Sequence, residues 1–482
     1  MTMKIPSHKT KIVCTIGPAS RSVSVIESMI KNGMNVARLN FSHGDFPEHK
    51  EDIHNIRQSS AKLKLPVSII IDLPGVKMRI GNLKDGALLL KMGDLVTLTT
   101  KNVLGTAAII PVSYKRLPQS VSKGSIIFLN DGFIQLKVEK VSGHDIRCRV
   151  VIGGKLLSHK GLNLPGAKLF IDPITERDLE IIDFGLQQGV TTFGLSFVEK
   201  AQDIIRVREF AQKRGKTVYL VAKIERSGAI ENIDGILKAT DAIMIARGDL
   251  GIETPIEQVP IVQKELIHKA NVTGRPVITA TQMLGSMTQN IRPTRAEVND
   301  VANAILDGTD AVMLSEETAI GDYPVETVKM MVKVAMSTES LYHSGQLSND
   351  IRRQIRSKAG ADGLTIPDII SLNVVDAVRK LKIKYILTQA SSGSTARHIS
   401  RLKPPCWILA FSNRKEVCDF LIFSYGVYPF LIKDKDNSHP GILLNIIKDF
   451  HLVKKGDLAI IAERRFSPYS GVTDSLGIVT LQ

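Results

Sequence analysis

The side chains best suited to phosphate chemistry follow two short apolar runs in the middle of the chain. The run Val218–Ala222 ends in Lys223 and Glu225, and the run Ala242–Ala246 ends near Asp249. Residues two apart in a strand point to the same face, so Lys223 and Glu225 are expected to lie side by side. Mg²⁺ takes one or two protein carboxylates and completes its shell with substrate oxygens and water, so this set suits a divalent cation carrying a phosphate. A structural ion pair is the alternative that this stretch alone leaves open.

Eight apolar, β-rich runs recur along the chain, and each closes in polar or glycine residues. Amphipathic segments with helical spacing, such as Val23–Lys31 and Arg295–Leu306, lie between them. Alternating buried strands and helices indicate a parallel sheet. Eight such units predict an α/β fold built on a (β/α)8 TIM barrel, whose functional residues gather at the C-terminal ends of the strands. The runs are Ile12–Gly17, Val36–Ser42, Val67–Leu73, Thr192–Val198, Val218–Glu225, Ala242–Gly248, Pro276–Thr281 and Ala311–Glu316.

Two further units are predicted around this barrel. Short alternating segments with turn signals at Asp85-Gly86 and Asp131-Gly132 predict a small β-barrel domain inserted at the barrel mouth as a lid. The end of the chain again alternates strands and helices, which predicts a separate doubly wound α/β domain. The expected division is barrel 1–73, lid 74–168, barrel 169–345 and C-terminal domain 346–482.

Length and composition describe an ordinary globular chain of 482 residues, long enough for roughly three domains. We expect no membrane span and no targeting segment, because no apolar run reaches about 18 residues and the N-terminus is polar. The four cysteines are far apart, which favours a reducing, cytoplasmic setting. The net charge of +15 raises the possibility of nucleic acid, but few aromatics and no long basic run make small anions the expected ligands.

One loop of the C-terminal part has the composition of an anion site. Thr388–Thr395 reads TQASSGST and joins a predicted strand to a predicted helix. Backbone N–H groups and hydroxyls at a helix N-terminus bind anions well. An ordinary serine-rich turn remains the alternative.

These motifs and several others resemble the pyruvate kinase family over nearly the whole chain. The family's architecture is a barrel, a lid after the third strand and a C-terminal effector domain, which agrees with the strand count above. The motifs that carry the resemblance are KIVCTIGPAS (Lys11–Ser20), NVARLNFSHG (Asn35–Gly44), KGLNLPG (Lys160–Gly166), AKIER, IMIARGDLGIE, ITATQML (Ile278–Leu284), the long segment Arg292–Pro324 and SGSTARHIS (Ser392–Ser400).

The resemblance implies phosphoryl transfer from phosphoenolpyruvate to ADP, which gives ATP and pyruvate at the end of glycolysis. Glu225 and Asp249 match the family's ligands for Mg²⁺ or Mn²⁺. Lys223 and Arg38 match the groups that face the transferring phosphoryl group, and Thr281 matches the threonine near the proton relay. Such chemistry asks the protein for charge neutralisation and alignment.

The resemblance also implies contacts on either side of the reacting phosphate. Ser196, Asp249 and the backbone of Ala246, Arg247 and Gly248 match the side that holds the substrate carboxylate. Each of these residues taken alone is more often structural than functional. The residues that match positions near the nucleotide are Thr15, Pro18, Asn40, His43, Arg79, Asp131 and Lys160.

One departure from the family pattern concerns potassium. Many members end the third strand in DTKGPEIR and hold K⁺ among an asparagine, a serine, the aspartate and the threonine. Asn40, Ser42 and Asp72 keep three of these positions, but the threonine is Leu73 and the glutamate is Lys77. Since a lysine ammonium is itself a compact cation, we expect Lys77 to replace the ion and K⁺ not to be required.

The resemblance further implies a homotetramer and an anionic allosteric effector, a sugar phosphate or a nucleotide. The opposing loop Ser467–Thr473 and the arginines Arg464 and Arg465 are expected to complete the effector site. The effector residues in the first loop are Thr388, Ser391, Ser392, Gly393, Ser394 and Thr395.

Two other classes of function stay open at this point. A Mg²⁺-dependent lyase of 2-oxo acids would share the metal carboxylates, but it gives no reason for Lys223, the lid and the nucleotide-side residues to occur together. A non-enzymatic protein that binds RNA or a partner would explain the positive charge, and salt-sensitive retention of RNA without turnover would favour it.

Overall fold

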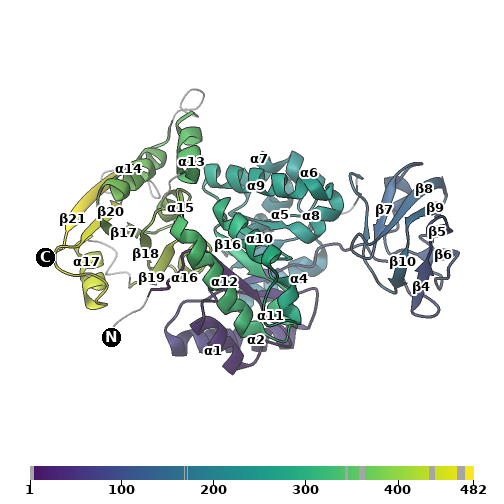
Figure 1. Ribbon diagram of the computed structural model, residues 1–482, viewed down its shortest axis with the longest axis horizontal. Helices are drawn as coiled ribbons and strands as arrows, with labels where there is room; N and C mark the ends of the chain where they lie inside the picture. Colours follow the sequence, from purple (N-terminus) through teal and green to yellow (C-terminus); the bar gives the residue numbers. More distant parts are fainter. Residues whose placement is uncertain are drawn as a thin grey trace.

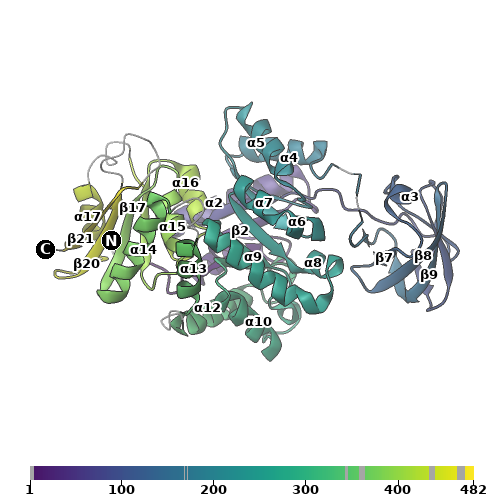
Figure 2. The same cartoon turned by 90° about the horizontal axis from the view of Figure 1, so that it is seen from above.

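The chain folds into three units that lie in a row. The computed structural model describes residues 5–167, 169–170, 172–341, 346–357, 364–433, 440–463 and 473–481. A lid stands at one end, a barrel lies in the middle and a second α/β unit lies at the other end, in both views (Figures 1 and 2). The lid and the C-terminal unit therefore contact opposite ends of the barrel.

The central unit is the predicted closed barrel of eight parallel strands. Its order is β1-β16-β15-β14-β13-β12-β3-β2. Each barrel strand pairs with the next barrel strand of the chain, β3 pairs with β12 across the lid insertion, and β1 pairs with β16 to close the barrel. Every predicted run contributes one strand, which confirms the fold class. The strands are β1 (Lys11–Thr15), β2 (Val36–Asn40), β3 (Ser68–Asp72), β12 (Thr192–Leu195), β13 (Tyr219–Ile224), β14 (Ala242–Ala246), β15 (Val277–Ala280) and β16 (Ala311–Leu314).

Helices surround the barrel, and side-chain caps fix where several of them begin. Asp45, Thr175 and Thr294 each accept a hydrogen bond from the third helical residue, whose acidic side chain reaches back to the cap. Each cap of this kind contributes about 1 kcal/mol and sets the length of the preceding loop. The helical elements are α1 (Val23–Lys31), α2 (Phe46–Leu63), α4 (Glu176–Gln187), α5 (Ala201–Gln212), α6 (Ser227–Glu231), α7 (Ile233–Ala239), α8 (Arg247–Glu253), η1 (Ile256–Gln258), α9 (Val259–Thr273), η2 (Gly285–Thr288), α10 (Arg295–Leu306), α11 (Glu316–Ala319) and α12 (Pro324–Glu339).

The lid is an all-β unit between β3 and β12. A six-stranded sheet of order β11-β7-β8-β9-β5-β6 and a two-stranded sheet of β10 and β4 enclose a core of their own. The alternating segments predicted from the sequence lie in β5, β7, β8 and β9. The lid elements are β4 (Ala87–Leu90), β5 (Leu95–Thr99), β6 (Ile109–Pro111), α3 (Leu117–Ser120), β7 (Ile126–Leu129), β8 (Ile134–Ser142), β9 (Asp145–Ile152), β10 (Gly154–Leu157) and β11 (Leu162–Asn163).

The C-terminal unit is a sheet of order β19-β18-β17-β20-β21, in which only β21 is antiparallel. One face, which includes Ile386 and Ile408, packs against α14 and α15, and the other, which includes Leu387 and Leu409, packs against α17. This two-sided packing is the predicted doubly wound arrangement. The elements are α13 (Gln346–Ser357), α14 (Ile366–Lys380), β17 (Ile383–Gln389), α15 (Ser394–Ser400), β18 (Trp407–Ser412), α16 (Lys415–Leu421), β19 (Val427–Leu431), α17 (Pro440–Asp449), β20 (Leu458–Glu463) and β21 (Ser475–Thr480).

Side chains from the C-terminal unit form part of the barrel's interior core. Phe420, Ile422 and Phe423 join the inward-facing strand residues in one buried cluster. The Phe420 ring stacks on Tyr219 of β13 with centroids 4.2 Å apart. The lower end of the barrel is therefore filled by α16 and the residues that follow it.

A buried ion pair joins the same two units. Lys403 donates from Nζ to Oδ1 of Asp310 at 2.8 Å, and both side chains are almost fully buried. Asp310 also accepts from the backbone N–H groups of Val277 and Tyr425. Burial lowers the pKa of Lys403, and Asp310 opposes that shift.

None of the helices described here is long and apolar enough to cross a membrane. All four cysteines are buried and unpaired, and burial raises the pKa of each thiol.

The Asp310–Lys403 pair leads to a stability prediction. Asp310→Asn removes one charge and leaves a buried ammonium unpaired, which costs about 3–5 kcal/mol. We expect the C-terminal unit to unfold at lower denaturant, as reported by the fluorescence of Trp407, the single tryptophan. The control is Glu180→Gln in the exposed pair Arg177–Glu180, where the loss should stay below about 1 kcal/mol. Equal midpoints for both variants would contradict the prediction.

Candidate active site

The candidate site lies at the C-terminal ends of the barrel strands, on the side that faces the lid. Lys223 is the last but one residue of β13 and Glu225 follows the strand directly, β3 ends in Asp72, and β2 carries Arg38. Parallel strands bring these ends to the same rim, so residues far apart in the chain become neighbours.

Lys223 is the centre of the charged cluster. Its ammonium lies 2.9 Å from Oε1 of Glu225 and 3.1 Å from Oδ1 of Asp72, and it donates to Oγ of Ser196 at 2.7 Å. Ser196 in turn donates to the carbonyl of Leu73 at 2.6 Å. Burial alone lowers the pKa of Lys223, but Asp72 and Glu225 outweigh it and raise the pKa. The ammonium is therefore charged and fixed between two carboxylates.

Asp72 is buried and neutralised from two sides. Besides Lys223, it accepts from Arg38 at 2.7 Å to Nε and 2.6 Å to a terminal nitrogen. Burial raises its pKa, yet Lys223 and Arg38 outweigh that effect and hold the pKa below its usual range. The other terminal nitrogen of Arg38 donates to Thr15 Oγ1 at 2.9 Å. Asp72 thus orients both cations of the site.

Glu225 is a buried carboxylate with less compensation. Its Oε2 accepts from the N–H of Phe197 at 2.7 Å, and Oε1 faces Lys223. Burial has the largest effect on the pKa of Glu225 and raises it; Lys223 lowers the pKa, Asp249 raises it, and the net shift is upward. Glu225 and Asp249 line one cavity of about 430 Å³, together with Lys77 and Glu253.

This pair of carboxylates fits a divalent cation. The carboxylates of Asp72, Glu225 and Asp249 exceed the cations of Lys223 and Arg38 by one charge. Asp72 is paired with both cations, whereas Glu225 is paired with Lys223. Within the residues that the structure describes, no cage of three or more His, Cys, Asp or Glu side chains forms. A cation here would complete its shell with ligand oxygens and water, as Mg²⁺ does.

Thr281 sits on strained backbone directly after β15, two strands away from β13 in the barrel. Both Thr281 and Gln282 have positive φ, +66° and +54°, which side chains rarely adopt and which functional sites often contain. The Thr281 hydroxyl donates to the carbonyl of Ala280 at 2.7 Å and accepts from the N–H of Gly248 at 2.8 Å. It therefore joins the end of β15 to the start of α8.

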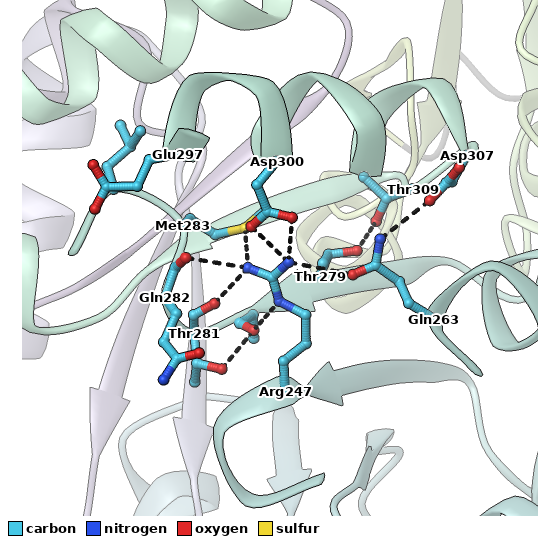
Figure 3. Close-up of polar contacts among 12 residues, drawn as sticks. Arg247, Gln263, Thr279, Thr281, Gln282, Met283, Glu297, Asp300, Asp307 and Thr309 are labelled. Carbon is cyan, nitrogen blue, oxygen red and sulfur yellow. Dashed lines mark hydrogen bonds and ion pairs between the residues drawn. The ribbon is translucent and has the colours of Figure 1, made fainter. Parts of the chain in front are cut away.

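The Arg247 side chain maintains this strained turn from behind, as Figure 3 shows. Its guanidinium donates to the carbonyls of Thr281 at 2.7 Å and of Ala280 and Gln282 at 3.3 Å. It also pairs with Asp300 of α10 at 2.7 Å. The role predicted for the Arg247 backbone stays a prediction, while its side chain stabilises the turn.

The residues predicted near the nucleotide fall into two groups. Thr15, Pro18, Asn40 and His43 lie at the ends of β1 and β2 or in the loops after them, whereas Arg79, Lys160 and Asp131 belong to the lid. Arg79 donates to the carbonyl of His159 at 2.8 Å and bridges to Gly161, the neighbour of Lys160. The structure does not bring the two groups into contact.

The residues predicted for the monovalent-cation site each have other partners in the structure. Asn40 accepts from the N–H of Ser42 at 3.2 Å, and the Leu73 carbonyl is occupied by Ser196. The charge partners of Asp72 are Arg38 and Lys223. Lys77 instead lines the cavity of Glu225 and Asp249, and its side chain points towards Gly161 of the lid. Across the described residues, Lys77 has no hydrogen bond or ion pair.

The predicted effector loop lies far from this rim, after β17. Gly393 has φ of +74° and caps α15, and Ser394 hydrogen-bonds with His398 at 3.1 Å. Thr395 contacts the hydroxyl of Thr473. The Thr388 hydroxyl is buried with no partner among the described residues. Arg464, Arg465 and residues 467–472 of the opposing loop lie outside the described part of the chain, whereas Ser391 and Ser392 are described and exposed.

Two residues of the cavity were not predicted from the sequence. Arg226 and Glu253 are buried beside the metal-ligand candidates, and burial raises the pKa of Glu253 to about 7. The signal available in the sequence was that Arg226 follows Glu225 directly and that Glu253 lies one helical turn after Asp249.

Comparisons with known proteins identify the family of the chain. The family model "Pyruvate kinase, barrel domain" matches residues 7–328, and "Pyruvate kinase, alpha/beta domain" matches residues 368–479. The pyruvate kinase of Thermococcus litoralis is 52% identical over 96% of both chains, and pyruvate kinase 2 of Synechocystis is 44% identical over 98% of this chain and 79% of its own. The crystal structure of a pyruvate kinase from Cryptosporidium parvum superposes with a TM-score of 0.91 at 35% identity, covering 99% of this chain and 97% of the other. This chain belongs to the pyruvate kinase family.

Proposed function

We propose that this chain transfers the phosphoryl group of phosphoenolpyruvate to ADP and releases ATP and pyruvate. The observation that carries the proposal is the Lys223 ammonium, fixed between Asp72, Glu225 and Ser196 at the rim of the barrel. Phosphoryl transfer needs preorganised positive charge at the transferring group and little covalent chemistry. Membership of the pyruvate kinase family supports the same reaction.

Lys223 and Arg38 would bind the transferring phosphoryl group from two directions. Both are oriented by Asp72, so their geometry is set before the substrate arrives. Preorganised charges of this kind need no rearrangement as charge develops in the transition state. Ser196 would add a hydroxyl on the side of the substrate carboxylate, next to the backbone of Ala246 to Gly248.

The family uses a divalent metal, and Glu225 and Asp249 would hold it here, as Mg²⁺ or Mn²⁺. Bound at this pair, the metal would neutralise charge on the phosphate and carboxylate oxygens. Thr281, which follows β15, is proposed to face the enolpyruvate, where the proton is delivered. Its strained backbone keeps the hydroxyl in place through the bond from Gly248.

The nucleotide is proposed to bridge the two separated groups of residues. Thr15, Pro18, Asn40 and His43 would contact it from the barrel, and Arg79, Asp131 and Lys160 from the lid. Closure of the lid would bring the groups together and exclude water, as in other enzymes with mobile lids.

The remaining proposals concern the whole protein. We propose the division into barrel 1–73, lid 74–168, barrel 169–345 and effector domain 346–482, a homotetramer, and an anionic effector bound at residues 388–395. The unpartnered, buried hydroxyl of Thr388 supports a ligand at that loop. A cytoplasmic location and a role in glycolysis follow from the proposed reaction.

The direct test is pyruvate formation from phosphoenolpyruvate and ADP with Mg²⁺. We expect turnover by the wild type and a loss of about 10³-fold in Lys223→Met, because one preorganised cation is removed from the transition state. Circular dichroism of the variant checks its fold. No turnover of phosphoenolpyruvate and ADP would favour the lyase or the non-enzymatic alternative, and salt-sensitive RNA binding would then favour the non-enzymatic one.

A second prediction concerns potassium, and it rests on Lys77. Turnover with K⁺ should match turnover in a tetramethylammonium salt at the same ionic strength of about 0.1 M. Lys77→Glu should become dependent on K⁺, because an acidic group would then stand beside the metal-ligand cavity. A wild type whose kcat collapses without K⁺ and recovers on its addition would remove the role assigned to Lys77.

A third prediction concerns the guanidinium behind Thr281. Lysine cannot reach three carbonyls and Asp300 at once, so Arg247→Lys should let the strained turn relax and lower kcat by about 100-fold. The matched control is Arg275→Lys, because Arg275 likewise binds the carbonyls of Leu237 and Lys238 but lies at the other end of the barrel. Activity within about twofold of wild type in Arg247→Lys, or an equal loss in both variants, would count against the assignment.

A further inference from the structure

The chain that returns from the lid to the barrel contacts Arg226 and Glu253, which lie close in sequence to the metal-ligand candidates. Helices α6 and α8 lie at the barrel end that faces the lid in Figures 1 and 2. The returning segment contacts them through Gly166 and Ala167. Ala167 also packs against the lid's own core, so this segment belongs mechanically to the lid.

Arg226 binds this segment from the barrel side. Its guanidinium donates to the carbonyl of Ala167 at 3.1 Å and pairs with Glu199, which follows β12. The Arg226 side chain is only 8% exposed. A buried guanidinium on a backbone carbonyl is a fixed, directional contact, since the planar group keeps its geometry.

Glu253 binds the same segment from α8. Its carboxylate faces the backbone N–H groups of Gly166 and Ser227. Arg226 Nε lies 3.8 Å from Glu253 Oε2, and that buried oxygen has no hydrogen bond within the described residues. This separation is within ion-pair reach but too long for a hydrogen bond, so the pair has room to shorten.

Each of these two residues shares a short element with one metal-ligand candidate. Arg226 follows Glu225 directly, and Glu253 lies one helical turn after Asp249 on α8. A shift of the lid's return segment therefore reaches both carboxylates through very few backbone bonds. The outgoing segment makes a different contact, from the N–H of Gly75 to Asp178 at 3.1 Å.

We propose that Arg226 and Glu253 form a clamp that couples the position of the lid to divalent-cation binding at Glu225 and Asp249. The clamp residues act as positioning residues: they hold the lid segment on the elements that present the carboxylates. Coupling of this kind is reciprocal, so the cation orders the return segment and the ordered segment strengthens cation binding. The proposal rests on the proposed function only for the identity of the metal site.

The test uses Mn²⁺ alone as the probe and two readouts other than activity. Electron paramagnetic resonance gives the dissociation constant of Mn²⁺, and hydrogen exchange gives the protection of residues 162–167 with and without the ion. In the wild type, Mn²⁺ should slow exchange in this segment. In Arg226→Gln we expect that slowing to disappear and Mn²⁺ to bind about fivefold or more weakly, the size of a typical coupling.

Two further variants keep the test decisive. Glu253→Gln retains the shape and a hydrogen-bond acceptor but loses the charge that faces Arg226. It should weaken Mn²⁺ binding and remove the Mn²⁺-dependent protection, as Arg226→Gln does. This variant keeps the proposal testable if Arg226→Gln fails to fold. The matched control is Arg206→Gln, because Arg206 also pairs with the returning segment, through Asp172, but stands on α5, which carries no metal-ligand candidate. It should leave both readouts within about twofold of wild type.

Specific outcomes would overturn the clamp. The clamp would be rejected if Mn²⁺ affinity and hydrogen-exchange protection were unchanged in both clamp variants. It would also be rejected if Arg206→Gln lost as much Mn²⁺ affinity and protection as they do, because that result would mean a general loosening of the segment. A wild type that binds Mn²⁺ with the expected coupling but forms no pyruvate would leave the clamp standing and reject only the proposed function.

Discussion

The site depends on one ammonium group shared by two buried carboxylates. Lys223 has to neutralise Asp72 and Glu225 at once, and it succeeds for Asp72 only because Arg38 contributes a second positive charge. Glu225 shares that ammonium with Asp72 and lines the same cavity as Asp249, an arrangement that suits a further cation. Burying a charge costs free energy unless an opposite charge is close by. The ends of β2, β3 and β13 therefore have to place Arg38 and Lys223 in contact with Asp72.

The backbone around this cluster is arranged to protect that geometry. The Arg247 guanidinium holds three successive carbonyls of a turn with positive φ, and the Thr281 hydroxyl connects the turn to α8. The strain at Thr281 and Gln282 is stabilised by contacts reaching back to Asp300 on the outer helix α10. Side chains outside the cavity thus determine where a group inside it can lie.

Much of this could be predicted from the sequence, because it follows from local patterns. The eight barrel strands, the lid and the C-terminal unit each have a periodicity that single segments reveal, and Lys223 and Glu225 share a face by spacing alone. Contacts between distant segments have no such signal. The pairing of Lys223 with Asp72, the direction of the Arg247 side chain and the place of Lys77 on the cavity wall each depend on how separate segments meet in three dimensions.

The aromatic side chains at the lower end of the barrel have a consequence for how the protein can be divided. Phe420 and Phe423 belong to the C-terminal unit by sequence but to the barrel's interior core by packing. A barrel produced without that unit would expose an apolar floor beneath the strands that carry the site, and such surfaces promote aggregation. The C-terminal unit is therefore not a detachable module: shuffling it between relatives would require exchanging the barrel floor with it.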